Sequence, residues 1–205
     1  MSEQAEPTGQ ARTRVGLPAG LCQVGLGGLA VLNFGTIMFS GALDDYQPGV
    51  VHTLFSWLLI VGWLYTAIVF ILWLYLAREN LEEQGADGLR WSQVQPVASW
   101  FTPVLNLWVP LLVVAEVYYR TDKLGNEPLP KKVLGWWVTF VLSLLLFAFH
   151  EFAVVNASVL FHYEPWLNMV YGALGCVAAG LGFHIVTHVT EIHQQWEQAP
   201  EPEAA

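Results

Sequence analysis

WFTPVLNLWVPLLVVAEVYYR, residues 100–120, is the stretch that decides the fold, because its length and its prolines give opposite indications. It is apolar and about as long as the ~20 residues that a helix needs to cross the ~30 Å hydrocarbon core of a bilayer. Pro103 and Pro110, however, each remove a backbone donor and clash with the preceding helical turn. A broken helix persists in a membrane only where protein or a wet cavity satisfies its backbone. The stretch therefore predicts either a distorted span or a segment that enters the membrane and returns.

The rest of the chain carries four stretches that look like plain membrane spans. The 205 residues are 55% hydrophobic and only 12% charged, with ten Trp, which favours one membrane domain over a soluble one. We expect spans at about 20–43, 50–77, 133–156 and 166–190, with the broken segment at 97–119. The membrane domain, 20–190, then lies between two polar tails, 1–19 and 191–205, whose composition predicts disorder.

The basic residues decide between four spans and five. The eight are Arg12, Arg14, Arg78, Arg90, Arg120, Lys123, Lys131 and Lys132. If 97–119 crossed the membrane, four of the eight would lie on each side, whereas if it returns all eight lie on one side with both termini. Basic residues in short loops stay cytoplasmic. The sequence thus predicts an all-α integral membrane protein with four transmembrane helices, a Pro-broken re-entrant or interfacial helical hairpin, and cytoplasmic termini.

Two histidines near the end of the last span could bind a metal. His184 and His188 are one helical turn apart, and Glu116 could add an oxygen ligand if the hairpin returns beside this helix. The alternative is that these histidines lie at headgroup level and need no special explanation. We favour this alternative, and we expect neither a metal nor another cofactor.

Titratable residues also gather toward the opposite side of the membrane. His150 and Glu151 resemble half of a zinc-protease motif, but Val154 stands where the second histidine would be. They could form an outer titratable rim with His52, His162, Glu164, Asp44 and Asp45. A proton- or metal-sensing rim is one interpretation, and a solvated interface with mutual hydrogen bonds is the one that we favour.

Small and polar residues indicate how the helices pack. Gly172, Cys176 and Gly180 recur every fourth residue, a spacing that lets another helix approach closely, so this packing face could receive a homo-oligomer or a partner membrane protein. Asn106 could satisfy the backbone groups that the prolines free, and Glu116 could pair with Arg120 one turn away. Besides the lipid bilayer and such a partner we expect no other, and the net charge of −9 without a basic stripe excludes nucleic acid.

A motif in the opening stretch resembles a known family. It reads W-F-x-P-x-x-N-L-W-x-P over residues 100–110, is followed by Glu116, and is preceded by similar stretches at 72–75, 80–81 and 85–92. These residues are similar to a bacterial multi-pass membrane family catalogued as domain of unknown function 4328. Its signature falls here on Asn80, Trp100, Pro103, Asn106, Trp108, Pro110 and Glu116. The resemblance implies a location in the bacterial plasma membrane, and it implies no activity and no catalytic residues.

Three classes of function remain open. The scattered, mostly interfacial polar groups favour a non-enzymatic scaffold or regulatory membrane subunit. A broken segment near Asn106 would also suit a transport or channel component, which with four spans would need an oligomer to enclose a pore. A metal-dependent membrane enzyme would use Glu116, His184 and His188. No nucleophile elbow, phosphate-binding loop or dinucleotide fingerprint occurs in the sequence.

Overall fold

The computed structural model describes residues 14–39, 50–86, 89–91, 99–100, 102, 105–122, 129–156 and 165–198. The helices in this part of the chain are α1 (Gly16–Phe39), α2 (Val50–Glu83), the 3-10 turn η1 (Leu105–Leu107), α4 (Val109–Thr121), α5 (Lys131–Asn156) and α6 (Pro165–Gln198). Four of them, α1, α2, α5 and α6, are long and apolar enough to cross a membrane. The predicted all-α fold with four membrane-spanning helices is confirmed.

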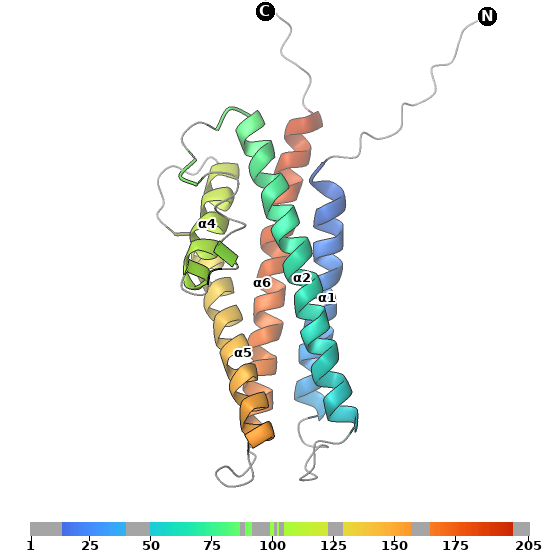
Figure 1. Ribbon diagram of the computed structural model, residues 1–205. Coiled ribbons are helices and arrows are strands. Elements are labelled where there is room, and N and C mark those ends of the chain that lie inside the picture. The colour runs from blue at the N-terminus through green and yellow to red at the C-terminus, as the bar shows by residue number, and fades with distance from the viewer. Residues whose placement is uncertain are drawn as a thin grey trace, which may run out of the picture.

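The helix lengths place α4 at one end of the bundle. α2 and α6 have 34 residues each, or about 51 Å at ~1.5 Å per residue, well beyond the ~30 Å hydrocarbon core. Their C-terminal ends lie at the same end of the bundle as the start of α1, and α4 lies beside them there (Figure 1). With 13 residues, about 20 Å, α4 is too short to span a bilayer. Among the described residues, the opening stretch therefore holds no helix long enough to be a fifth span.

Pro110 begins a helix where a break was expected. It occupies the first turn of α4, where its missing N–H leaves no hydrogen bond unmade. Ahead of it the chain turns through η1. There the backbone N–H of Asn106 donates to the Thr102 carbonyl at 2.8 Å, and the backbone N–H of Trp108 donates to the Leu105 carbonyl at 3.2 Å. The bend thus lies between Thr102 and Trp108. Pro103 lies outside the described residues.

The tails predicted at 1–19 and 191–205 are shorter in the structure. α1 already begins at Gly16, and Val15 and Ala19 are buried beside it. α6 continues to Gln198, because His193 is buried and Trp196 packs against the core of the bundle. Residues 1–13 and 199–205 lie outside the described part of the chain, as do 40–43, where the first span was expected to end.

α1 and α6 approach most closely where both carry small or polar residues. A Cβ atom at Gly172 would collide with the Thr36 hydroxyl, and one at Gly175 with the Asn33 side-chain oxygen. The Cys176 thiol lies 3.4 Å from the Ala30 carbonyl, which accepts its weak hydrogen bond. The small-residue face expected to receive a partner is therefore occupied by α1 of the same chain. Gly180, the third member of that predicted face, has no atom of another segment within 4 Å of where its Cβ would be.

α2 and α5 are held together by side chains rather than by close backbones. Within the described residues no Cα atom of α2 lies within 8 Å of one of α5. The Trp63 ring instead reaches Phe140, with ring centres 6.1 Å apart, and Phe147, at 5.6 Å. Further toward α4, the rings of Phe70 and Trp136 stack at 5.2 Å. Large aromatic side chains thus fill the space between these two helices.

Candidate functional site

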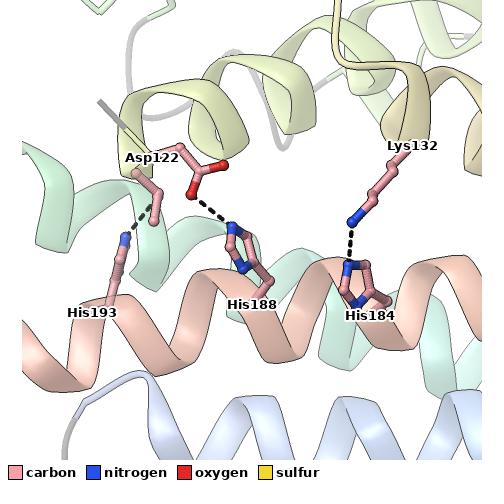
Figure 2. A network of polar contacts seen from close by, with 6 residues as sticks. Asp122, Lys132, His184, His188 and His193 are labelled. Carbon is pink, nitrogen blue, oxygen red and sulfur yellow. Dashed lines mark hydrogen bonds and ion pairs between the residues drawn. The ribbon is translucent and has the colours of Figure 1, made fainter. Parts of the chain in front are cut away.

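The polar contacts of the structure concentrate at the end of the bundle that carries α4. We call the described residues between 99 and 122, with η1 and α4, the hairpin. We call the whole region the hairpin end, which comprises the hairpin, the first turn of α5, α2 from Trp73 onward and α6 from His184 onward. Figure 2 shows its three α6 histidines pointing toward the segments before and after the α4–α5 connection. Trp73 also joins it, because its indole N–H donates to the Thr190 hydroxyl at 3.0 Å.

His193 is the buried junction of three helices. Its Nε2 lies 3.0 Å from the Thr121 hydroxyl of α4 and its Nδ1 lies 3.2 Å from the Asn80 amide nitrogen of α2. An amide nitrogen only donates, so Nδ1 accepts and the proton of the neutral ring is on Nε2, which donates to Thr121. The ring is 0% exposed and stacks on Trp196 with centres 4.8 Å apart. His193 therefore ties α2, α4 and α6 together as an uncharged residue.

His188 and His184 make the two outer contacts of the network. The His188 Nε2 lies 2.6 Å from the Asp122 carboxylate, directly after α4, and the His188 ring packs 5.2 Å from Tyr118. The Lys132 ammonium, in the first turn of α5, donates to the His184 Nε2 at 2.8 Å. Burial, and then the nearby Asp122 carboxylate, raise the pKa of Tyr118. The histidines thus bracket the connection between α4 and α5.

Glu116 does not join these histidines. Its side chain is 4% exposed, and its carboxylate accepts the backbone N–H of Arg90 at 2.7 Å. No group of three or more potential ligands able to hold a metal ion occurs among the described residues. The structure therefore does not assemble the metal site considered for Glu116, His184 and His188. The guanidinium of Arg120, expected beside Glu116, lies 5.8 Å from the centre of the Tyr119 ring.

Other signature residues anchor the hairpin through aromatic packing. Trp100 meets Phe70 edge-on at 6.2 Å and Trp137 at 6.1 Å. The Trp137 indole N–H donates to the Leu107 carbonyl at 3.0 Å, so α5 satisfies a backbone group in the bend of the hairpin. Trp108 is 47% exposed and faces outward. These contacts fix the depth to which the hairpin reaches along α5.

Asn106 does not play the backbone-satisfying role expected of it. Its backbone N–H makes the bond to Thr102, whereas its side-chain oxygen is buried and has no hydrogen-bond partner among the described residues. The Trp137 indole, not Asn106, satisfies the carbonyl of Leu107. The local sequence around Asn106 could not predict this, because Trp137 lies on a different helix, α5.

His150 lies inside the bundle rather than in a solvated rim. It is 2% exposed, its ring packs 5.7 Å from Tyr171, and its Nδ1 lies 3.5 Å from the Glu151 carboxylate. Glu151 accepts a hydrogen bond from the Ser56 hydroxyl of α2 at 2.9 Å. The expectation of a solvated site for His150 is therefore wrong, because this side of α5 packs against α6. The other expected members of the rim fall outside the described side chains.

Sequence reasoning missed His193 because the polar composition of 191–205 indicates a tail. A signal was present, since Val186, Val189, His193 and Trp196 recur at helical spacing and would lie on one face. The partner Thr121 carries no such signal, because it lies in the polar end of a helix that its neighbours fix in place.

The fold and this site define a multi-pass helical membrane protein with a packed, polar hairpin end. The family described as "Domain of unknown function (DUF4328)" matches residues 49–192, which is most of the chain, and the protein belongs to this family. Its match begins just before α2 and ends within the last turns of α6, so it includes α4 and most of the hairpin end but stops one residue before His193. No curated protein and no solved structure matches the chain.

Proposed function

We propose that the protein is a non-enzymatic scaffold or regulatory subunit of the bacterial plasma membrane, with the hairpin end as its cytoplasmic docking platform. The observation that carries this proposal is the construction of that end. α2 and α6 extend beyond the length that a bilayer core requires, and α4 is fastened between them through His193. An element built in this way presents a fixed surface at the membrane boundary.

The side chains that could act in catalysis or bind a metal make contacts that hold this platform together. Glu116 binds the backbone of Arg90, His188 lies against Asp122, and His184 accepts from Lys132. The aromatic packing of Trp63 between α2 and α5 favours a scaffold over a conduit, because apolar rings fill the space between these helices. A cytoplasmic orientation agrees with the basic residues of the hairpin end, by the tendency of such residues to remain inside.

Site-specific photocrosslinking in native membranes tests the proposal. A photoreactive amino acid at Gln195, an exposed position at the end of α6, is expected to capture a discrete protein partner. The matched control is Val31, which is 71% exposed on α1 in the apolar span and is expected to capture lipid. Adducts that form equally at both positions, or none beyond lipid at Gln195 and at Glu83, would refute a docking platform.

A further inference from the structure

A buried arginine in α2 has no hydrogen-bond partner in the described structure. The Arg78 side chain is 3% exposed, and Nε, Nη1 and Nη2 are all buried with no acceptor among the described residues. Glu82 is its one described ion-pair neighbour, with Oε1 3.6 Å from Nε, and the Glu82 side chain is 36% exposed. This contact is longer than a hydrogen bond and is partly screened by solvent. The guanidinium donors are thus left without acceptors.

Deprotonation cannot relieve the cost of burying the Arg78 guanidinium. The guanidinium of an arginine keeps its positive charge in proteins, in contrast to the side chains of Lys and His, which can become neutral when buried. A buried charge is normally paired or hydrogen-bonded, because burial without compensation is strongly destabilising. Glu116, the buried carboxylate of α4, makes no ion pair with Arg78 and already accepts the Arg90 N–H. The missing component is an anion.

The position of Arg78 indicates which anion this is. Arg78 lies about 42 Å along α2 from Val50 at ~1.5 Å per residue, which is the level of the lipid headgroups for a bilayer of ~40–45 Å total thickness. It follows Phe70 and Leu74 at intervals of four, and Phe70 meets Trp100 of the hairpin. Arg78 therefore belongs to the face of α2 that is turned toward the hairpin. Trp73 and Asn80 lie on the other face, toward α6.

We propose that Arg78 is the cationic centre of a binding site for a phosphate oxyanion, at the seam between α2 and the hairpin. The planar guanidinium matches a phosphate group through two parallel charge-assisted hydrogen bonds. Phospholipid headgroups present this group at the depth of Arg78, and inorganic phosphate presents the same chemistry from the cytosol. Because Arg78 is buried, the anion enters when the hairpin opens locally from α2. This proposal is independent of the scaffold function.

The melting temperature of the purified full-length chain in a neutral detergent tests the proposal. Added phosphatidylglycerol, inorganic phosphate and phosphate-free diacylglycerol form the three arms, with tryptophan fluorescence as the readout. For the wild type, a phosphate-bearing ligand at about 100 times its Kd should raise the melting temperature by roughly 5–10 °C. A rise with phosphatidylglycerol alone assigns the site to a lipid headgroup, and a rise with inorganic phosphate assigns it to a soluble anion. An equal rise with diacylglycerol, or no rise in any arm, overturns the proposal.

Four variants assign the effect to Arg78. Arg78→Gln should abolish the rise and Arg78→Lys should retain part of it, whereas Arg14→Gln should keep it in full, because Arg14 is an exposed arginine at the same end of the bundle. Arg78→Leu in the absence of phosphate should melt at or above the wild-type temperature. Melting of Arg78→Leu far below the wild type without ligand would mean that the chain itself satisfies Arg78, and an equal loss in Arg14→Gln would mean non-specific charge binding. Both results overturn the proposal.

Discussion

Removing the His193 imidazole should release α4 from the bundle. In His193→Ala the hydrogen bonds to Asn80 and Thr121 are lost, at about 1 kcal/mol each. Only the Thr121 bond reaches α4, because Asn80 belongs to α2 and Trp196 to α6, the helix of His193 itself. The buried Thr121 hydroxyl is left without this partner while α4 is closed, which costs about 1–2 kcal/mol. This cost corresponds to a roughly tenfold increase in the population of the open hairpin.

Thiol labelling measures this opening directly. Val117, in the middle of α4, is 2% exposed, so a cysteine introduced there reacts only when α4 separates from the bundle. The labelling rate of Val117→Cys should increase about tenfold when His193→Ala is added. The parent chain, with its native Cys22 and Cys176, gives the background rate.

His188→Ala is the matched control, because it removes a second imidazole from the same helix. The side chains of His188 and its partner Asp122 are 30% and 18% exposed, and such a solvent-screened pair contributes about 0.2–1 kcal/mol. Its effect on the labelling rate of Val117→Cys should stay below about fivefold. If His193→Ala and His188→Ala accelerate labelling equally, or if His193→Ala changes the rate less than threefold, His193 is not the junction that holds α4.

Three further substitutions test other contacts. Trp137→Phe removes the bond to the Leu107 carbonyl, about 1 kcal/mol, and should lower the melting temperature by about 2–4 °C in a thermal scan. Gly175→Ala should lower the free energy of unfolding by about 1–3 kcal/mol in a denaturant titration, because the new Cβ collides with Asn33. Adding Asn33→Ala should restore most of this loss, and a failure to restore it would contradict the observed packing of α1 against α6. Burial raises the pKa of Tyr118, so the folded state keeps the phenolic proton at a pH where the unfolded chain loses it. The stability of the fold should therefore fall as the pH rises above about 10. In a series of melting temperatures at different pH, Tyr118→Phe should flatten that fall.

The number of apolar spans could be predicted because it depends on properties that each segment carries by itself. Apolar length identifies a span whatever it packs against, and the positions of basic residues such as Arg120 and Lys132 indicate which segments share a side. The prolines showed that the helix is interrupted, but they did not show where the next helix begins. Pro110 indicated an interruption, and only the structure shows that it opens α4.

The contacts of the candidate site could not be predicted, because they depend on the register between helices that are distant in sequence. Whether His188 meets Asp122 or Glu116 is decided by a shift of nearly two helical turns between α4 and α6, and no local pattern reports such a shift. The same holds for α1 and α6, where the small-residue ladder correctly indicated close packing but not the partner. Asn33 is that partner, and it lies about 140 residues away from Gly175.

The residues that carry the family resemblance gather at the hairpin end rather than in the middle of the spans. Asn80 holds His193, Glu116 holds the backbone at Arg90, and Trp100 packs between α2 and α5. Apolar spans need only length and hydrophobicity, which many sequences supply, whereas a hairpin folded against two helix ends requires particular hydrogen-bond partners. The specific part of this sequence is therefore the part that builds a surface at the membrane boundary. The docking platform proposed above would need such a surface.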